Sequence, residues 1–475
     1  MASLLWLDND LRIHDHEALR AALADPGPVL PMFLWAPETL GDWAPGGASR
    51  WWLHHSLQAL QARLADRGAS LHLAQGDPGQ RLRELAEAVD ADTVHWTRRL
   101  GPERARRDER AREVLAEASL DVHVHDGRIL HDPAEVETTS GGPYRVFTPF
   151  WDRFQAEVHV PRPQPAPEAI ATPSSVPEGC ELVDLDLLPT PDWAHGLRET
   201  WRPGEAGAHQ RLATVVDDRL DAYLEARDRP DVEGTSRLSP HLAWGEISPR
   251  TVWWRVKDAI LDGAVDPEAA RGFLRQVGWR EFGYHLIHHF PQTPTEPLRE
   301  KYENLPWRRA PDELERWRRG RTGFPLVDAG LRQLWHEGWI HNRVRMVVGA
   351  FLAKHLLLPW QEGAEWFWDT LVDADLANNT LGWQWAAGCG ADAQPFFRMF
   401  NPMTQGEDHD PDGAYVRRWV PELADLPDEY LNRPWEAPPE VLAQADVELG
   451  EDYPEPIVDH GEARARAQSA YDRIG

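Results

Sequence analysis

The first 35 residues, MASLLWLDNDLRIHDHEALRAALADPGPVLPMFLW (1–35), contain a complete strand–helix–strand pattern. SLLWL (3–7) and VLPMFLW (29–35) are apolar runs of strand length, and HEALRAALAD (16–25) between them has helical periodicity. The alternation continues to about residue 130, with further strands expected near LHLAQG (71–76), TVHWT (93–97) and LDVHVHDG (120–127). Strands that alternate with helices predict a parallel, doubly wound α/β sheet.

The rest of the chain has a different pattern. Residues 131–204 lose periodicity and carry eight prolines between Pro161 and Pro191, which is typical of a long connector. A short helix is expected in it around TPFWDRFQAEV (148–158). From residue 205 onward nearly every segment has helical periodicity. We therefore predict three parts: an α/β domain (1–130), an interdomain linker (131–204) and an all-α domain (205–475).

The charge of the chain admits two interpretations. Asp and Glu total 78 against 50 Lys and Arg, a net charge of −28, and only three residues are lysine. Such acidity argues against a nucleic-acid partner, because DNA binding depends on neutralising phosphates. Alternatively, an acidic surface adapts a halophilic protein to high salt, where screening lets a local basic groove still bind DNA.

Two distant cysteines and the start of the chain bear on location. Cys180 and Cys389 provide no disulfide framework, which favours a reducing cytoplasm. The N-terminus is expected to be a strand rather than a signal peptide, and no apolar run is long enough to span a membrane.

Four stretches in the helical half combine polar and aromatic residues. GTSRLSPHLAWGEISPR (234–250) predicts a helix start with Ser239 as N-cap before Pro240, which suits a phosphate but also any well-capped helix. WREFGYHLIHHF (279–290) places Arg280 beside Glu281, as in an ordinary ion pair, and its histidines match no metal-binding pattern.

The other two stretches are GWIHNRVRM (338–346) and DADLANNTLGWQW (373–385). In the first, Asn342 and Met346 share a helix face, and an amide with a soft apolar neighbour can recognise a base edge. The second groups two carboxylates, two amides and two indoles, which a capped helix end with core tryptophans would also explain.

Taken together, the order, spacing and residue identities of these stretches resemble those of the photolyase/cryptochrome family. The likeness is most specific in GRTGFPLVDAGLRQLWHEGWIHNRVRM (320–346) and DADLANNTLGWQWAAGCGADAQPFFRMFNP (373–402), and the α/β half matches in layout. It is closest to class I bacterial photolyases that repair cyclobutane pyrimidine dimers. The resemblance implies an N-terminal Rossmann-like antenna domain and a C-terminal all-helical domain that holds FAD.

The resemblance also implies the residues that bind FAD. Asn379 stands at the position that faces flavin N5, and Arg345 would pair with Asp373. Trp383 would be the indole nearest the flavin, with Trp360 and Trp307 completing an electron-transfer chain to the surface. The full set of implied FAD-binding residues is Tyr223, Thr235, Ser236, Arg237, Leu238, Ser239, Arg345, Asp373, Ala374, Asp375 and Asn379.

A second implied set contacts UV-damaged DNA. Trp279, Trp385, Asn342, Arg343 and Met346 match the pocket for the flipped-out lesion. The segment from Gln276 to Gly283, with Arg280, and also Gln405, match DNA-contacting positions, and Arg227 and Arg398 are candidate phosphate contacts.

The chain departs from the family's usual residues at Gln276, Leu7 and Asp8. Dimer-repairing relatives usually carry glutamate where this chain has Gln276; relatives that repair (6-4) photoproducts often have Gln there, but have histidines in place of Asn342 and Met346. The N-terminal motif has Leu7 and Asp8 where relatives often have Phe and Arg. Glu103 resembles the glutamate that holds a methenyltetrahydrofolate antenna, which favours that second chromophore over a deazaflavin.

These features predict a light-driven deoxyribodipyrimidine photo-lyase: a monomer that acts on UV-damaged DNA, with no membrane partner and no metal. Three alternatives remain: a (6-4) photolyase, a cryptochrome-like blue-light receptor, which Gln276 favours, and a light-independent flavoprotein oxidoreductase. The lack of a long output tail after YPEPIVDH (453–460) counts against the receptor, and the third alternative leaves Asn342, Arg343 and Met346 unexplained.

Overall fold

The computed structural model describes residues 1–393, 395–396 and 398–474, which form two compact units. The first unit contains residues 1–221, 236–291 and 372–377, and the second contains residues 222–235, 292–371 and 378–475. Each unit therefore takes segments that are far apart along the chain. The sequential division at residues 130 and 204 stays a prediction.

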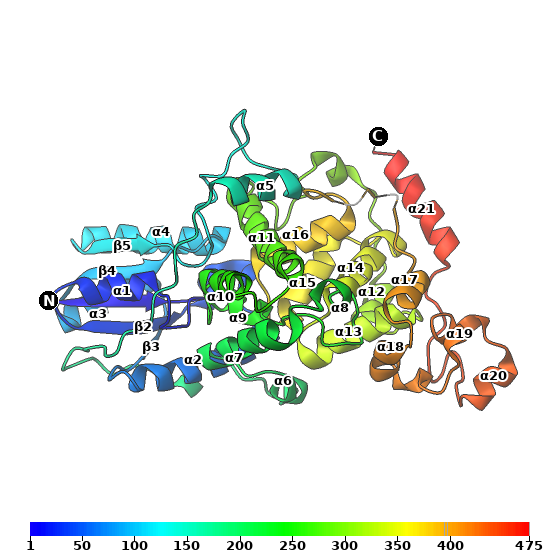
Figure 1. The fold of residues 1–475 in the computed structure, drawn as a ribbon, viewed down its shortest axis with the longest axis horizontal. Coiled ribbons are helices and arrows are strands. Elements are labelled where there is room, and N and C mark those ends of the chain that lie inside the picture. The colour runs from blue at the N-terminus through cyan, green and yellow to red at the C-terminus, as the bar shows by residue number, and fades with distance from the viewer. Residues whose placement is uncertain (394, 397, 475) are drawn as a thin grey trace. The chain divides into compact units, whose positions relative to one another are not determined.

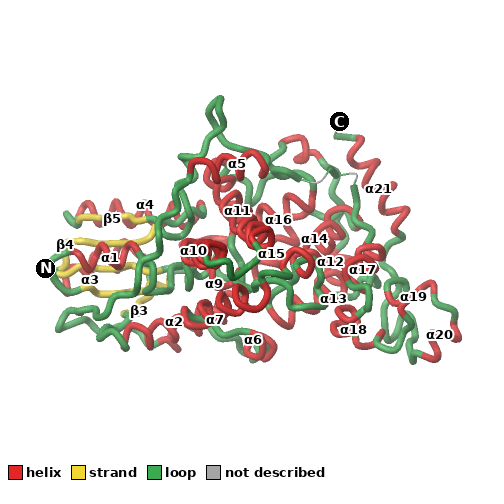
Figure 2. The backbone as a smooth tube through the Cα atoms, viewed as in Figure 1, coloured by secondary structure: helices red, strands yellow, loops and turns green. Residues whose placement is uncertain are grey.

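The five predicted strands form one parallel sheet in the first unit, with strand order β3-β2-β1-β4-β5 (Figure 2). A helix follows each of the first four strands, so the predicted doubly wound α/β fold is confirmed. The elements are β1 (Ala2–Leu7), α1 (Glu17–Ala24), β2 (Val29–Trp35), α2 (Gly47–Ala65), β3 (His72–Gln75), α3 (Pro78–Val89), β4 (Ala91–Thr97), α4 (Pro102–Glu117) and β5 (Asp121–His125).

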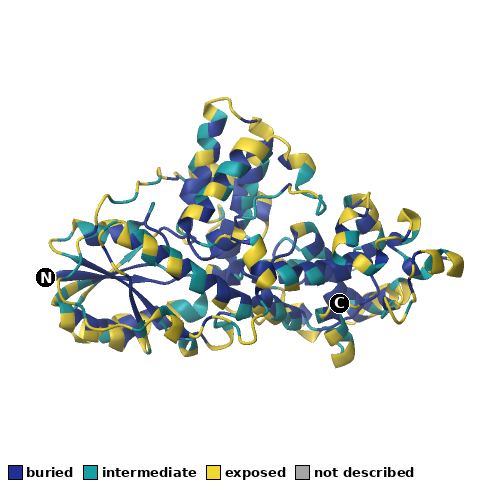
Figure 3. Ribbon diagram, turned by 90° about the horizontal axis from the view of Figure 1, so that it is seen from below, coloured by how far each residue is buried: buried dark blue, intermediate teal, exposed yellow. Residues whose placement is uncertain are grey.

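Alternate side chains of the central strand supply the core on one face of the sheet. Leu4 and Trp6 of β1 pack with Leu82 of α3 and Leu115 of α4, and all four side chains are buried. Helices α1 and α2 connect strands towards β3, whereas α3 and α4 connect strands towards β5. Because parallel crossovers are right-handed, α1 and α2 therefore cover the other face of the sheet. β1 and β2 in the middle of the sheet are buried almost throughout, whereas no residue of the edge strand β5 is fully buried. The outer faces of the flanking helices are exposed (Figure 3).

The remaining helices of the first unit lie within the connector (residues 131–204) or after it. The predicted helix at 148–158 is observed as α5, which packs against α11. Gly278 of α11 permits this approach, because a Cβ atom there would lie 2.4 Å from the ring of Trp151 on α5. The bounds are α5 (Phe147–Glu157), α6 (His195–Thr200), α7 (Glu205–Thr214), a π-helical turn (Val215–Arg219), α9 (Ser239–Ala243), α10 (Pro249–Leu261) and α11 (Pro267–His289).

The described part of the second unit is helical, as the sequence predicted for this half (Figure 1). Across the described residues, no helix is both long and apolar enough to cross a membrane. The helices are α8 (Tyr223–Ala226), α12 (Pro311–Arg318), α13 (Pro325–Glu337), α14 (Asn342–Ala350), α15 (Trp360–Thr370), α17 (Pro402–His409), α18 (Ala414–Trp419), α19 (Asp428–Leu431), α20 (Pro439–Gln444) and α21 (His460–Asp472), with α16 (Leu376–Ala387) continuing from the first unit.

The predicted capping role of Ser239 is wrong. Leu238 occupies the N-cap position of α9, no side chain caps that helix, and Ser239 is its first helical residue. The turn forms earlier: Arg237 adopts a left-handed φ of 50°, and the Ser236 hydroxyl accepts the backbone N–H of Leu238 at 3.3 Å. The five-residue α9 is thus entered through a serine turn, which local sequence preference did not reveal.

The buried His285 of α11 predicts acid sensitivity of the first unit. Its Nε2 accepts the backbone N–H of Tyr144 at 3.0 Å, and burial, together with His289 and His131, lowers the pKa of His285 to about 3. An unfolded histidine titrates near about 6.5. The unfolded chain therefore binds the proton first, and stability is lost as the pH falls from about 6.5 toward 3.

His285→Gln keeps an acceptor for Tyr144 but does not titrate. We expect the free energy of unfolding of this variant to fall less steeply than that of wild type as the pH drops from 6.5 to 5. The difference between the two slopes should be up to about 1.4 kcal/mol per pH unit. Urea unfolding at several pH values measures this, with exposed His159→Gln as the control. Equal slopes for wild type and His285→Gln would contradict the prediction.

Candidate functional site

The residues predicted to bind a flavin or to carry electrons to it divide between the two units. The predicted pairing of Arg345 with Asp373 would join a residue of the second unit to one of the first, and it stays a prediction. The first set is Ser236, Arg237, Leu238, Ser239, Asp373, Ala374 and Asp375, and the second is Tyr223, Thr235, Arg345, Asn379, Trp307, Trp360 and Trp383.

Asp375 is held by two donors within the first unit. Its Oδ2 accepts a hydrogen bond from the Tyr284 hydroxyl and pairs with Nη2 of Arg128 at 3.2 Å. Burial, together with the Asp375 carboxylate, raises the pKa of Tyr284 to about 12, although Arg128 opposes this shift. The phenol therefore keeps its proton and acts as a donor to a buried carboxylate.

Arg128 organises the surroundings of this carboxylate. Its guanidinium also donates to the backbone oxygens of Asn9 at 2.7 Å and Ala243 at 2.9 Å, and Arg280 donates to the backbone oxygen of Arg128 at 2.9 Å. Burial by itself would lower the pKa of Arg128, but Tyr284 and Asp375 raise it above its ordinary value. The guanidinium is thus a permanent cation beside Asp375.

Sequence reasoning missed both partners of Asp375. Tyr284 stands one helical turn after Arg280 in the WREFGYH stretch, so helix periodicity offered a signal for it. Arg128 lies 247 residues before Asp375, and no local pattern connects them. The neighbouring backbone is also fixed, since the Trp244 indole N–H donates to the carbonyl oxygen of Val372 at 3.2 Å.

Asn379 and Gly382 lie one turn apart on α16. The Asn379 amide is buried, and its Nδ2 donates to the backbone oxygen of Ala364 on α15 at 3.0 Å, which fixes the direction of the amide oxygen. Gly382 is exposed, and a Cβ atom there would meet no atom within 4 Å. This helix face therefore offers an oriented amide beside open space.

The indole of Trp383 is tightly enclosed within the second unit. Its ring lies 4.9 Å from the ring of Phe367 and 6.1 Å from that of Trp317, centroid to centroid, while its N–H has no hydrogen-bond partner in the described structure. Gly363 of α15 allows this packing, since a Cβ atom there would lie 2.0 Å from the indole.

The three tryptophans of the predicted electron-transfer chain show the expected change in burial, but the ring contacts of Trp383 are with other residues. Trp360 is buried and Trp307 half-buried, as a path from interior to surface requires. Within the described residues, however, the aromatic rings that contact Trp383 are those of Trp317 and Phe367. The route through Trp360 and Trp307 stays a prediction.

The other predicted cofactor residues differ in burial. Tyr223 is buried, which raises the pKa of its phenol to about 12, and Arg227 lies over its ring at 5.5 Å. Thr235 and Ser236 are half-buried, and Ser239 is exposed. Arg237 lies over the ring of Trp201 at 5.9 Å, and Arg345 lies over that of Phe367 at the same distance.

Gln276 and Trp279 form a half-exposed stretch of α11, one turn apart. The Trp279 ring stacks on buried Phe147 with centroids 3.8 Å apart and planes at 7°, so the indole is rigidly backed. A rigid aromatic surface beside an amide suits the stacking and hydrogen bonding of a base.

Arg280 and Gly283, on the same helix, are buried. Arg280 pairs with Glu281 at 3.2 Å, which confirms the plain ion-pair interpretation of WREF, and its guanidinium also lies over Tyr284. Glu281 in turn accepts the backbone N–H of Leu130 at 2.7 Å. A DNA contact by Arg280 stays a prediction, and its burial does not favour one.

In the second unit, α14 presents the predicted Asn–Arg–Met group near its N-terminus. Asn342 is exposed and its amide donates to Sδ of half-buried Met346 at 3.7 Å, so the two share a face as predicted. Arg343 instead pairs with Asp228 at 3.0 Å. Trp385 is half-buried with its ring 6.3 Å from Phe400, Gln405 is half-buried on α17, and Arg398 is exposed.

Glu103, the candidate antenna residue, lies in the first turn of α4 and forms an ion pair with Arg106. The nearby Asp8 is surrounded by arginines: Arg107 at 2.5 Å, Arg104 at 3.4 Å and Arg99 at 3.6 Å. Burial alone would raise the pKa of Asp8, but these three cations hold it well below its usual range.

Comparison with known proteins places these features in one family. The DNA photolyase model matches residues 3–168, and the model for the FAD binding domain of DNA photolyase matches residues 273–473. The chain belongs to the photolyase/cryptochrome family and contains its FAD-binding domain.

The relatives include both repair enzymes and cryptochromes. The chain is 46% identical to the deoxyribodipyrimidine photo-lyase of Agrobacterium fabrum, over 98% of this chain and 97% of that protein. It is 37% identical to cryptochrome-1 of Arabidopsis thaliana, over 99% of this chain and 70% of that protein. Its fold matches the crystal structure of a bacterial class III photolyase from Agrobacterium tumefaciens with a TM-score of 0.96, at 45% identity over 100% of this chain and 97% of that one. The family prediction is confirmed, whereas class I membership stays a prediction.

The residues in each unit fit a bound FAD. The open space at Gly382, the oriented amide of Asn379 and the indole of Trp383 suit a flat ring system, and the half-buried hydroxyls of Thr235 and Ser236 suit a phosphate or sugar. Asp375 is buried with its charge compensated by Arg128.

Two glycines of the second unit predict opposite stability effects. In Gly363→Ala the new methyl group collides with the enclosed Trp383 ring, so we expect a loss of about 1–3 kcal/mol, only partly offset by the roughly 1 kcal/mol that alanine gains over glycine in a helix. Gly382→Ala should be neutral or slightly stabilising, since its Cβ meets nothing within 4 Å.

Urea unfolding of flavin-free protein compares these two variants. When flavin retention is measured instead, Gly382→Ala should lose flavin although its fold is intact. Full retention would show that the cofactor does not lie on this face of α16, and a Gly363→Ala variant as stable as wild type would contradict the packing argument.

Proposed function

We propose that this protein is a deoxyribodipyrimidine photo-lyase that splits cyclobutane pyrimidine dimers in UV-damaged DNA. The observation that carries the proposal is the Asn342–Met346 pair, an amide and a thioether on the exposed start of α14. The likeness to a photo-lyase across nearly the full length of both chains supports it. In relatives that repair (6-4) photoproducts, histidines stand at these two positions.

FAD, when bound in its reduced form, would supply an electron to the dimer on absorbing blue light. The roles of the protein are to bind, orient and exclude water. Asn379 would present its amide oxygen to the flavin, because Ala364 takes its N–H. Asp373 and Asp375 would bind the polar part of the cofactor, with Arg128 and Tyr284 holding Asp375 in place. Trp383, Trp360 and Trp307 would pass electrons inward.

The lesion would be flipped out of the duplex, at a cost reduced by its poor stacking. Trp279, backed by Phe147, would stack on the extruded pair. The amides of Gln276 and Asn342 can each donate to and accept from base edges. Trp385, Gln405, Arg227, Arg343 and Arg398 would contact the strand, where Arg343 must exchange its ion pair with Asp228 for a phosphate.

A cryptochrome-like photoreceptor is the second candidate. Gln276 favours it, because the carboxylate usual in dimer repair is missing, and so does the similarity to cryptochrome-1. A (6-4) photolyase is favoured by Gln276 alone. Repair activity separates these candidates, since a receptor would photoreduce its flavin without restoring any pyrimidine.

Further proposals concern the antenna and the setting. Glu103 would bind a methenyltetrahydrofolate antenna after releasing Arg106. Both cysteines are free, and burial raises the pKa of the Cys389 thiol to about 12, so this thiol is unreactive, as suits the reducing cytoplasm that we propose. We further propose that the protein is a monomer. The acidic surface would fit strong salt.

Blue-light repair of a UV-damaged thymine oligonucleotide by photoreduced protein tests the proposal. We expect thymine absorbance to recover under light and not in the dark, across a salt series. Flavin that photoreduces while no dimer is split would overturn the proposal and favour the receptor, and repair of only (6-4) photoproducts would favour the third candidate.

Gln276→Glu should improve dimer repair. A carboxylate accepts a stronger hydrogen bond than a neutral amide oxygen, and a gain of about 1 kcal/mol corresponds to roughly fivefold tighter binding of the lesion. The dissociation constant for a dimer-containing duplex and the quantum yield of repair measure the effect. Gln155→Glu, on an exposed position of α5, controls for the added negative charge. Unchanged or weaker repair by Gln276→Glu would count against a dimer-binding role for this position.

A further inference from the structure

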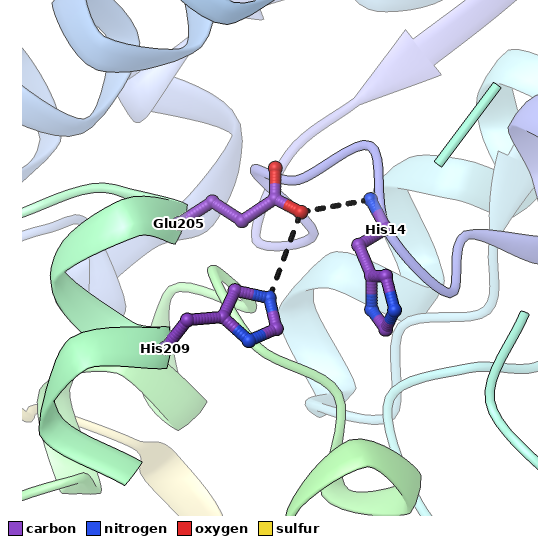
Figure 4. A group of neighbouring side chains, drawn as sticks. All are labelled: His14, Glu205 and His209. Carbon is purple, nitrogen blue, oxygen red and sulfur yellow. Dashed lines mark hydrogen bonds and ion pairs between the residues drawn. The ribbon is translucent and has the colours of Figure 1, made fainter. Parts of the chain in front are cut away.

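Three potential metal ligands that are remote in the sequence converge in the first unit. His14 lies on the segment after β1, and Glu205 and His209 begin α7. One ligand atom from each lies within 4.8 Å of the others, and Figure 4 shows the Glu205 carboxylate between the two imidazole-bearing segments. None of the proposed roles in FAD or DNA binding uses these residues.

The carboxylate is the fixed member of this cluster. Glu205 is buried, and it accepts the backbone N–H of His14 at 2.9 Å and that of Ile13 at 3.2 Å. These bonds attach the segment after β1 to the first turn of α7. They also hold the His14 ring beside that of His209, with centroids 5.1 Å apart and planes at 89°.

Helix geometry adds the second imidazole. Residues i and i+4 of a helix project from the same face, so Glu205 and His209 of α7 can both coordinate one metal ion. Nε2 of His209 lies 3.9 Å from Oε1 of Glu205. In a tetrahedral zinc site with bonds of about 2.0–2.1 Å, ligand atoms are roughly 3.3 Å apart. A small rotation of His209, whose side chain is 38% exposed, would close this gap.

The donor set selects the class of metal. Two imidazole nitrogens and one carboxylate oxygen suit Zn²⁺ and similar transition-metal ions, whereas Ca²⁺ and Mg²⁺ prefer oxygen ligands throughout. Arg63 opposes a cation, but its Nε lies 3.6 Å from Oε2 of Glu205, the oxygen that does not approach His209. Its side chain is 38% exposed and can turn into solvent.

We propose that His14, Glu205 and His209 bind one Zn²⁺ ion, with water as the fourth ligand. The ion would link the segment after β1 to the start of α7, and so hold the end of the connector close to the α/β sheet. The role is structural and independent of light-driven repair.

Zinc binding to the full-length, untagged protein tests the proposal. After chelator treatment and dialysis, we expect one zinc ion per chain by elemental analysis, and a higher melting temperature with zinc than without. Co²⁺ as a substitute should give the visible absorption of a tetrahedral site. His209→Ala, at a partly exposed position, should weaken zinc binding at least tenfold and abolish the stabilisation.

His14→Ala provides a second, independent removal of a ligand, while Glu205 is left intact because it holds two backbone N–H groups. His54→Ala is the matched control, since His54 belongs to a neighbouring, half-exposed histidine pair on α2. Zinc binding that is substoichiometric, that is the same in His209→Ala and wild type, or that is lost in His54→Ala would overturn the proposal.

Discussion

The buried guanidinium of Arg128 is the constraint on which the chemistry of the first unit depends. It donates to two backbone oxygens, of Asn9 after β1 and of Ala243 at the end of α9, and to the carboxylate of Asp375. Three segments that are distant in the sequence therefore share one rigid planar donor. A buried cation that loses a partner raises the free energy of the folded state. Removal of any one acceptor of Arg128 therefore destabilises the arrangement of all three segments.

The second unit uses steric closeness rather than charge to fix its aromatic centre. Trp383 fits because Gly363 lacks a side chain, and the rings of Phe367 and Trp317 hold the indole on its other sides. An enclosed indole cannot reorient, and this rigidity suits the electron-transfer role proposed for Trp383. Asn379, four residues earlier on α16, is fixed by a hydrogen bond to α15. Both α15 and α16 thus position the residues that would face a flavin.

The local sequence pattern predicted the sheet well, because the strands of residues 1–130 are short apolar segments that alternate with helices. SLLWL and VLPMFLW, for example, form β1 and β2. The pattern failed at Ser239, where a left-handed residue and the Ser236 hydroxyl set the turn. The motifs predicted the family, which is confirmed, and through it the roles of Asn379 and Trp383, which stay predictions. They did not point to Arg128, whose partner Asp375 is 247 residues away. The His14–Glu205–His209 cluster was invisible for the same reason: only folding brings residues 14 and 205 together.

The departure at Asp8 illustrates why a single substitution should be interpreted with its surroundings. Taken alone, an acid where relatives often have arginine suggests a lost function in the N-terminal motif. In the structure the Asp8 carboxylate is enclosed by the guanidinium groups of Arg99, Arg104 and Arg107, two of which also pair with Asp108. With three cations present, a fourth at position 8 would be repelled, whereas an acid compensates them. Arg99 and the two arginines in the first turns of α4 therefore supply the positive charge that balances a carboxylate at position 8.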